Sequence, residues 1–369
     1  MHLRKLHLLN FKNYEAADLD LEGSVHCFLG RNGSGKTNLL DAIHYLSLTR
    51  GINGAPDVTN IRHGAQHFLV RGVFEQHGKR KEIACTFTPE RKKKISEDGK
   101  EYTRFSDHIG KFPLVLVAPE DIELVWGGGE EKRKFFDTLL SQLDREYLDQ
   151  LIVYQSNLRH RNGLLKMSAD RPTIDRELLA TYDERLVYSG TQLQERRRAF
   201  VDRLLPVLQK HYAFLVRQPG EIPGLTYTSD LDGVDFGREL VSRLERDRIL
   251  GRTTVGVHRD EFKFTLGGHE LKLFGSQGQQ KSYLIALKLA EFDFLASKNG
   301  FRPLLLLDDI FDKLDDERIV QLMKLVAGGT FGQIFITDAR PGRSMESLTQ
   351  AGIEAQCFQV EGGNLTRSR

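Results

Sequence analysis

The sequence has few cysteines, a single tryptophan and almost no net charge. Its 369 residues include 3 cysteines, Cys27, Cys85 and Cys357, whose spacing matches no metal-ligand motif and no disulfide framework. The odd number suits a reducing compartment, so we expect a cytoplasmic protein in which each cysteine is a small buried side chain. No apolar run approaches the length of a membrane span, and the first residues (MHLRKLHLLNFKNY) lack the apolar core of a signal peptide. We therefore expect no membrane partner.

The formal net charge is only +2, from 53 Lys and Arg against 51 Asp and Glu, so total charge does not indicate a nucleic-acid-binding protein. Basic residues do cluster locally, and each cluster could neutralise phosphates, although a single charge run is more often a solvated face. The clusters are residues 79–81, 91–94, 132–134, 159–161 and 196–198. The first two flank predicted hairpin turns at His77-Gly78 and Asp98-Gly99.

Residues 30–37 (GRNGSGKT) fit the phosphate-loop pattern G-x-x-x-x-G-K-[ST]. Glycines let backbone N–H groups surround a phosphate, while a lysine and a hydroxyl reach the terminal phosphates and Mg²⁺. An apolar run at 25–29 predicts a buried strand before the loop, and helical spacing at 38–48 predicts a helix after it. We expect ATP to be bound by Gly30, Arg31, Asn32, Gly33, Ser34, Gly35, Lys36 and Thr37, and we expect Lys36 to be a catalytic residue as well.

A second motif is acidic. Residues 304–307 are four leucines that run directly into Asp308 and Asp309, as in a central parallel strand that carries carboxylates to the edge of a sheet. Asp308, with Thr37, is expected to hold Mg²⁺, and Asp309 is the candidate for polarising the attacking water. Without the phosphate loop, a buried strand ending in an acidic turn would explain the pattern equally well.

A third motif, residues 276–281 (SQGQQK), precedes apolar residues at helical spacing over 282–295. A serine hydroxyl and glycine amides at a helix start favour an anion, although an ordinary N-cap at Ser276 would look the same. A second phosphate site is redundant within one nucleotide pocket. It makes sense if Ser276, Gly278 and Gln279 contact the phosphates bound by another protomer.

The three motifs resemble those of the ABC-type ATPases, and within them the branch that works on DNA. More narrowly, the chain resembles the RecF family of bacterial recombination-repair proteins from end to end. The matching segments are FKNY (11–14), APED (118–121), RHRN (159–162), HRD (258–260), GSQGQQK (275–281), ALKLAE (286–291) and LLLLDDIFDKLDD (304–316).

This resemblance implies an ATP-dependent homodimer that closes with two nucleotides between the protomers, grips double-stranded or single-stranded DNA, and opens on hydrolysis. It implies a weak, DNA-stimulated ATPase in recombinational repair, replication restart and the SOS response, with RecR, RecO and RecA loading as its setting. It also implies that Lys12 and Asn13 lie near the nucleotide and that Asp315 lies in a loop crossing the dimer seam. For the HRD segment it implies a structural or nucleotide-proximal role rather than a catalytic one.

Several residues differ from those of related ATPases in ways that affect the expected rate of ATP hydrolysis. ABC transporters have Glu where this chain has Asp309, and a switch histidine where it has Thr337 and Asp338. Both differences predict slow turnover. In addition, Val257 replaces the proline that usually precedes HRD in the family, which loosens a turn but keeps the charged residues.

The expected fold class is α/β: an ABC-type ATPase lobe, with a mixed sheet, a phosphate-loop helix and antiparallel strands, interrupted by a mostly helical lobe. We expect the ATPase lobe at 1–112 and 251–369 and the helical insertion at 113–250. Amphipathic helices are predicted at 132–143, 146–165 and 175–216, the last broken near Pro206. Only residues 38–275 separate the first motif from the third, without sustained heptads, so no long coiled coil is expected.

Other functions remain open at this point. The nucleotide-binding subunit of an ABC transporter would share the ATPase core, but the residues at 309 and 338 argue against it. A nuclease coupled to the ATPase would need a further metal-binding acidic domain. A scaffold that binds ATP without hydrolysing it differs only in its measured hydrolysis.

Overall fold

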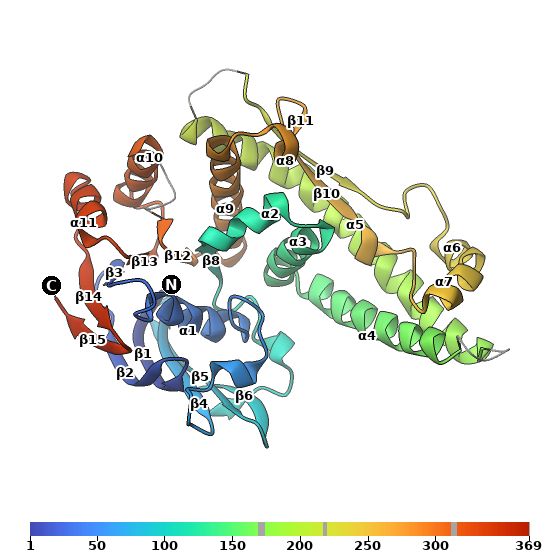
Figure 1. Cartoon of the computed structure of the whole chain (residues 1–369), viewed down its shortest axis with the longest axis horizontal. Helices are drawn as coiled ribbons and strands as arrows, with labels where there is room; N and C mark the ends of the chain where they lie inside the picture. The colour runs from blue at the N-terminus through green and yellow to red at the C-terminus, as the bar shows by residue number, and fades with distance from the viewer. Residues whose placement is uncertain (169–173, 217–219, 311–315, 369) are drawn as a thin grey trace. The chain divides into compact units, whose positions relative to one another are not determined.

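The computed structural model describes residues 1–168, 174–216, 220–310 and 316–368. The chain forms two compact units (Figure 1). The first comprises residues 1–121, 214–217 and 284–369, and the second comprises residues 122–213 and 218–283. Among the described residues, no helix combines the length and the apolar character needed to cross a membrane.

The first unit contains an antiparallel six-stranded sheet in the order β2-β1-β4-β5-β6-β7. Buried and less buried residues alternate along β4, because one face of this sheet covers a core. Both predicted hairpin turns have two residues with positive φ, as in a type I′ turn: 49° and 75° at His77 and Gly78, and 50° and 78° at Asp98 and Gly99. The strands are β1 (His2–Phe11), β2 (Tyr14–Asp20), β4 (Phe68–Gln76), β5 (Lys79–Thr88), β6 (Lys92–Glu97) and β7 (Lys100–Glu101).

The second sheet of this unit has the order β15-β14-β3-β13-β12-β8, and all its neighbours pair in parallel except β14 and β15. Strands β3, β12 and β13 are buried at every residue, which explains the unbroken leucine run of β12 and the apolar centres of β3 and β13. The strands are β3 (Val25–Leu29), β8 (Leu114–Val117), β12 (Leu304–Leu307), β13 (Gln333–Asp338), β14 (Gln356–Glu361) and β15 (Asn364–Arg367).

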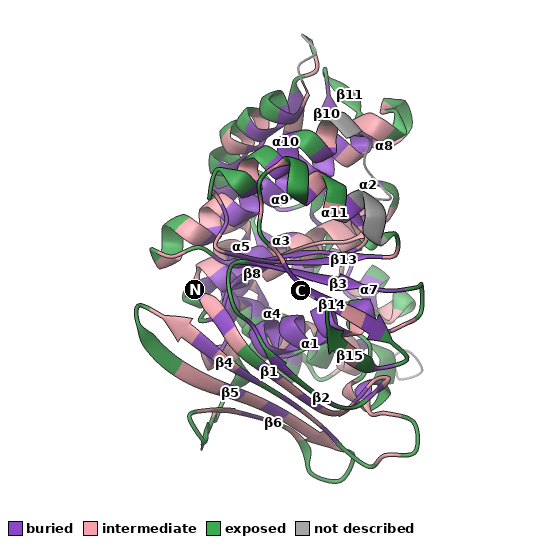
Figure 2. Ribbon diagram, turned by 90° about the vertical axis from the view of Figure 1, so that its left-hand side faces the viewer, coloured by how far each residue is buried: buried purple, intermediate pink, exposed green. Residues whose placement is uncertain are grey.

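Helix α1 (Lys36–Leu48) packs against strands of both sheets and is buried over nearly its whole length, as the purple colour in Figure 2 shows. Its apolar residues join side chains from both sheets in one continuous core. The part of α9 (Gln277–Asn299) from Leu284 onward, α10 (Asp316–Ala327) and α11 (Pro341–Gln350) complete the unit. The mixed sheet and phosphate-loop helix agree with the fold class expected from the sequence.

The second unit is mostly helical and has a small antiparallel sheet of order β11-β10-β9. Its strands are β9 (Pro223–Thr228), β10 (Glu261–Leu266) and β11 (His269–Glu270). Its helices are α2 (Glu123–Trp126), α3 (Gly129–Leu143), α4 (Arg145–Met167), α5 (Arg176–Leu215, which reaches the first unit at Phe214), α6 (Phe236–Ser242), α7 (Leu244–Leu250), α8 (Leu271–Phe274) and the first turns of α9.

Three details differ from the sequence expectations. The expected boundary at 112 would assign Leu114–Val117 to the helical lobe, whereas this segment is β8 and pairs with β12. Residues 251–283 belong to the helical unit because β10 pairs with β9 there. Helix α5 also continues through Pro206 instead of breaking. Leu204 and Leu208 are fully buried on either side of it, and their packing offsets the cost of about 3 kcal/mol of a helical proline.

Candidate functional site

The candidate site lies at the carboxyl edge of the parallel sheet in the first unit. Strands β3, β13 and β12 run in the same direction, so the segments that follow Leu29, Asp338 and Leu307 emerge at one edge. The Gly30 N–H donates to the backbone carbonyl of Asp338 across this edge (3.2 Å). The fold therefore brings the phosphate loop and the acidic strand together, as the carboxyl ends of such strands usually form the ligand site.

The phosphate loop depends on glycine at two positions. Gly33 and Gly35 have φ values of 79° and 116°, a region that residues with a Cβ rarely adopt. A Cβ on Gly35 would also collide with the amide of Asn13. The glycines of the motif are thus explained by backbone geometry before any ligand is considered.

Lys36 is a buried cation within this loop, with 4% of its surface exposed. Its Nζ donates to the carbonyls of Gly30 (3.0 Å) and Arg31 (3.2 Å). Among the described residues, no carboxylate forms an ion pair with it. Since buried charges are normally paired, this lysine fits an anion such as the phosphate of a nucleotide.

Asp308 is buried next to the loop and accepts two hydroxyl hydrogen bonds on Oδ1. The donors are Thr37 Oγ1 (3.1 Å), from the phosphate loop, and Thr337 Oγ1 (2.5 Å), from β13. Burial raises the pKa of Asp308, and the nearby carboxylates of Asp309 and Glu120 raise it further. A divalent cation would relieve this concentration of negative charge, and an oxygen donor set of carboxylate and hydroxyl fits Mg²⁺. Thr37 and Asp308 are the residues that would hold it.

Asp309 has a φ of 43°, which is uncommon for a residue with a Cβ and recurs at functional sites. Its backbone N–H donates to Thr337 Oγ1 (2.9 Å). One threonine hydroxyl therefore orients both acidic residues, since it also donates to Asp308. The sequence comparison placed Thr337 and Asp338 at the position of the transporters' switch histidine, but it did not predict the contacts of Thr337 with Asp308 and Asp309, because no pattern within a single strand shows which strand lies beside it.

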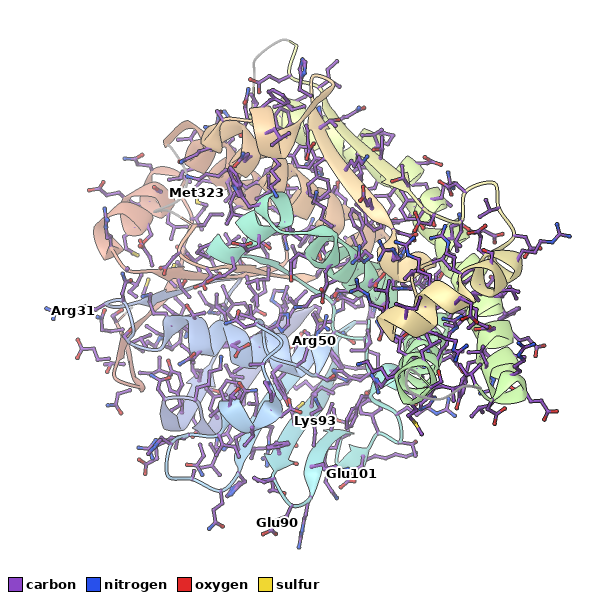
Figure 3. The ribbon with its side chains drawn as sticks, turned by 45° about the vertical axis from the view of Figure 1, so that its right-hand side comes forward. Arg31, Arg50, Glu90, Lys93, Glu101 and Met323 are labelled. Atoms are coloured by element: carbon purple, nitrogen blue, oxygen red, sulfur yellow. The ribbon has the colours of Figure 1, made fainter. Side chains whose placement is uncertain are left out.

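Lys12 and Asn13 were both expected near the nucleotide, but their side chains contact different parts of the chain. The Lys12 ammonium forms an ion pair with the buried carboxylate of Asp41 in α1. Asn13 Nδ2 donates to the Ser34 carbonyl in the phosphate loop (3.0 Å). Arg31, like Asn32, is exposed, and its side chain extends away from the ribbon (Figure 3).

The third motif belongs to the second unit. Ser276 Oγ accepts a hydrogen bond from the Gln279 N–H (3.2 Å), and the Gln279 side chain accepts one from the Ser276 N–H (2.7 Å). This reciprocal pair is a capping box at the start of α9. Gln279 Nε2 also donates to Glu221 (2.8 Å), while Gly278 follows in the first turn. Asp315, expected at a dimer seam, lies outside the described residues.

Comparisons with known proteins identify the family. The family described as RecF/RecN/SMC N terminal domain matches residues 2–360. A Bacteroides fragilis protein named DNA replication and repair protein RecF is 43% identical over 364 residues, covering 98% of this chain and 97% of its own length. The chain belongs to the RecF family.

Further similarities to this RecF-family chain extend over its full length. A Cytophaga hutchinsonii protein with the same RecF name is 41% identical over 368 residues, covering 100% of this chain and 97% of its own. A solved structure described as the recombination mediator protein RecF-ATPrS in the RecFOR pathway has a TM-score of 0.89 at 27% identity, covering 100% of this chain and 98% of that one. An SMC head domain from Pyrococcus furiosus shares the fold, with a TM-score of 0.55 at 16% identity and coverage of 99% and 95%.

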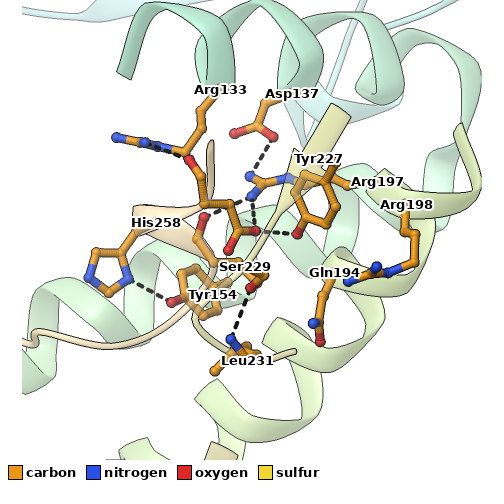
Figure 4. Close-up of polar contacts among 12 residues, drawn as sticks. Arg133, Asp137, Tyr154, Gln194, Arg197, Arg198, Tyr227, Ser229, Leu231 and His258 are labelled. Carbon is orange, nitrogen blue, oxygen red and sulfur yellow. Dashed lines mark hydrogen bonds and ion pairs between the residues drawn. The ribbon is translucent and has the colours of Figure 1, made fainter. Parts of the chain in front are cut away.

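The HRD segment of this RecF-family chain is part of a buried polar network in the second unit (Figure 4). His258 Nε2 donates to the Thr253 carbonyl (3.1 Å), and Nδ1 accepts from the Tyr154 hydroxyl (2.8 Å). Because burial lowers the pKa of His258 to about 4, the ring is neutral near pH 7. Asp260 is buried and bonded to Arg197 Nη1 (2.9 Å). These contacts give His258 and Asp260 a structural role.

A second buried ion network lies in the first unit of this RecF-family chain, where the turn after β8 meets α9. Asp121 Oδ2 accepts the Ala118 N–H (2.8 Å), and its Oδ1 pairs with Lys288 Nζ (2.9 Å). Glu291 is 3.8 Å from the same ammonium and is buried. Burial raises the pKa of Glu291 to about 7, a shift that Lys288 reduces but does not cancel.

This shift predicts a pH-dependent effect of Glu291→Gln. A carboxyl whose pKa is raised by folding holds its proton more tightly in the folded state, so its ionisation lowers stability as pH rises from about 4.5 to 7. The substitution should therefore raise the free energy of unfolding by about 1–3 kcal/mol at pH 8 and change it little at pH 5. Urea unfolding at the two pH values measures the difference. Equal effects at pH 5 and pH 8 would contradict it.

Proposed function

We propose that this chain is an ATP-driven DNA clamp of the RecF type, acting in DNA replication and repair. The observation that carries the proposal is the buried Lys36, held by loop carbonyls without a carboxylate among the described residues, at the edge where Thr37 and Asp308 meet. This arrangement suits the phosphates of ATP with Mg²⁺. The curated relatives bear the name DNA replication and repair protein, and a structural relative is described with ATP.

ATP would act by joining two copies of the chain. Ser276 and the N–H groups of the first turn of α9 suit the terminal phosphate of a nucleotide bound by a second protomer. The capping box does not prevent this, because Ser276 Oγ accepts a hydrogen bond there and keeps its own proton to donate. Two nucleotides would then stabilise one symmetric dimer.

Some residues of the basic clusters are held in ion pairs within the chain, so fewer of them are free to bind DNA phosphates. In the helical unit, Arg161 and Arg197 are buried and paired with carboxylates. In the first unit, Lys93 is anchored to Asp57 (3.0 Å). Arg91 and Lys92, at the turn between β5 and β6, are exposed, and no ion pair is recorded for them among the described residues. Figure 3 marks this turn by Glu90.

This turn lies at the same end of the antiparallel sheet as the phosphate loop. The register runs from Leu9 in β1 through Leu69 and Thr86 to Lys94 in β6, and β1 leads directly into Asn13 beside the loop. Across the sheet, however, the neighbouring Lys93 Nζ donates to the Thr49 carbonyl at the C-terminal end of α1 (2.8 Å), so the turn lies at the end of this helix opposite the phosphate loop. We assign Arg91 and Lys92 to the DNA surface because both are exposed and form no ion pair among the described residues.

Hydrolysis by this site should be slow and should release the clamp. Asp309 is one methylene shorter than the glutamate of transporters and would orient the water less closely. Action in replication restart and the SOS response, together with RecR, RecO and RecA loading, follows from the same family proposal. A steady-state rate of tens of turnovers per second would contradict a slow switch.

The test is sedimentation with and without ATP and double-stranded DNA. We expect the wild type to dimerise and bind DNA only with ATP, Lys36→Met to do neither, and Ser276→Arg to bind ATP as a monomer. Replacing both Arg91 and Lys92 by Glu should preserve dimerisation and weaken DNA binding at least tenfold, because each lost phosphate contact removes part of the electrostatic binding free energy. The affinity of this variant for DNA should also depend less steeply on salt concentration. The matched control reverses Lys79 and Arg80, at the opposite end of β5.

The outcomes separate the proposals. A wild type that stays monomeric with ATP and ignores DNA would overturn the clamp and favour a transporter-like or scaffold function. Dimerisation with undiminished DNA binding by the Arg91 and Lys92 variant would overturn only the DNA surface. Dimerisation without measurable hydrolysis would support an ATP-binding scaffold.

A further inference from the structure

The last hairpin of the chain contacts the phosphate loop from behind. Strand β14 lies beside β3, which leads into the loop, and the turn between β14 and β15 therefore reaches Ser34. The Gly363 N–H donates to the Ser34 carbonyl (3.2 Å). Gly363 is buried, whereas Gly362 in the same turn is exposed. A segment far from the motif in sequence is thus part of the wall of the nucleotide loop.

The same carbonyl has a second donor. Asn13 Nδ2 donates to Ser34 O (3.0 Å), while Asn13 Oδ1 accepts from Asn38 Nδ2 (2.7 Å), which orients the amide. The next carbonyl along the loop, Gly35 O, accepts the hydroxyl of Tyr14 (3.0 Å). Gly35 O also accepts the first helical bonds of α1, from the Asn38 N–H (3.0 Å) and the Leu39 N–H (3.3 Å), so Tyr14 and the helix together hold this peptide.

Because each peptide group is planar, a contact that fixes the direction of its carbonyl also fixes the direction of its N–H. In a trans peptide the C=O and N–H bonds point in opposite directions. A Ser34 carbonyl directed toward Asn13 and Gly363 therefore directs the Gly35 N–H away from them. In the same way, the contacts of Gly35 O with Tyr14 and with the first turn of α1 direct the Lys36 N–H away from these groups. Such N–H groups are the ones that phosphate loops use to bind phosphate.

We infer that Gly363, with Asn13 and Tyr14, is a positioning residue for ATP binding, and that it acts by orienting the phosphate-loop amides. This inference rests on the ATP binding in the proposed function. It gives Asn13 a role behind the loop instead of direct contact with the nucleotide. It also makes the C-terminal hairpin a functional part of the nucleotide site.

The turn itself provides a matched pair of variants. Gly362 and Gly363 both have positive φ, 55° and 85°, as a two-residue type I′ turn requires. Alanine at either position therefore carries the same kind of backbone strain. An added Cβ at Gly363 would lie 2.5 Å from the Asn13 carbonyl oxygen, whereas one at Gly362 would meet nothing within 4 Å.

The experiment measures the Kd of a ribose-labelled fluorescent ATP analogue, the KM and kcat for ATP, and the Tm of Gly362→Ala and Gly363→Ala. We expect Gly363→Ala to raise Kd and KM about tenfold with kcat nearly unchanged, since binding to phosphate is lost equally in the ground and transition states. Gly362→Ala should change Kd by less than about twofold. A merely structural defect would instead lower the folded fraction, and kcat with it, at constant KM.

Equal Kd and KM values in the two alanine variants would overturn the inference. If Gly363→Ala does not fold, Asn13→Ala decides, because it removes one donor to Ser34 O without backbone strain. It should raise Kd about three- to tenfold, and an unchanged Kd would overturn the inference. A wild type that does not bind the analogue would instead contradict the proposed function.

Discussion

Replacing Arg197 by Met is expected to lower the free energy of unfolding by about 3–5 kcal/mol. The guanidinium is 2% exposed and donates to four groups: the Tyr147 hydroxyl (2.9 Å), the Val257 carbonyl (2.7 Å), Asp260 (2.9 Å) and Asp137 (2.7 Å). Methionine fills a similar volume but leaves two carboxylates in a poorly solvated site without their cation. Urea unfolding followed by circular dichroism measures the loss.

The neighbouring residue provides the control. The Arg198 side chain is 48% exposed and forms an ion pair with the half-exposed Asp232. Exposed pairs of this kind contribute about 0–1 kcal/mol, so Arg198→Met should be nearly neutral. Adding Asp137→Asn and Asp260→Asn to Arg197→Met should recover part of the loss, because it removes the unpaired charges. An Arg197→Met cost no larger than that of Arg198→Met would refute the structural role of this network.

The parts of the fold that the sequence predicted are those governed by local rules. The phosphate loop has glycines where φ is positive, and the two I′ turns are marked by His77-Gly78 and Asp98-Gly99. The continuous apolar run at Leu304–Leu307 indicates a strand buried on both faces. Each of these signals depends only on neighbouring residues, so no knowledge of tertiary contacts was needed.

The parts that were not predicted depend on partners far away in sequence. Arg161 and Arg197 look like members of solvated basic clusters, yet each is buried because carboxylates from other segments of the chain surround it. The short β8 segment could be assigned to the sheet only through its pairing with β12. Pro206 stays within α5 because tertiary packing outweighs the local helix propensity.

In the candidate site, too, some residues could be predicted from local motifs and others depend on contacts between distant parts of the chain. Lys36, Thr37 and Asp308 come from motifs whose chemistry is visible in the sequence, and the fold brings them together. Thr337 and Gly363 contact the same site from β13 and from the last hairpin. Thr337 was noted only because it stands where transporters have the switch histidine, and no short pattern identifies Gly363. The sequence left an ordinary N-cap at Ser276 open as the alternative to an anion site, and the structure has such a cap, extended by the Gln279 side chain to a reciprocal capping box.

Thr337→Val is expected to lower kcat for ATP hydrolysis about 10- to 100-fold with little change in KM. Valine keeps the shape of the side chain but removes the hydroxyl that donates to Asp308 Oδ1 and accepts the Asp309 N–H. The phosphate loop, which supplies most of the ATP binding, is not altered. The orientation of both carboxylates is lost, and with it the placement of Mg²⁺ and of the attacking water.

Thr337→Ser is the matched control, because it keeps the hydroxyl and removes only the methyl group. It should retain kcat within about threefold, and ATP binding should stay similar in both variants, whereas Thr337→Val alone should lower Tm because it removes one hydrogen-bond partner each from buried Asp308 and from the Asp309 N–H. Since Asp308 is buried, an unoriented carboxylate would also bind Mg²⁺ more weakly, so the Mg²⁺ concentration for half-maximal hydrolysis should rise in Thr337→Val alone. Equal kcat values for the valine and serine variants would show that the hydroxyl does not orient the two acids.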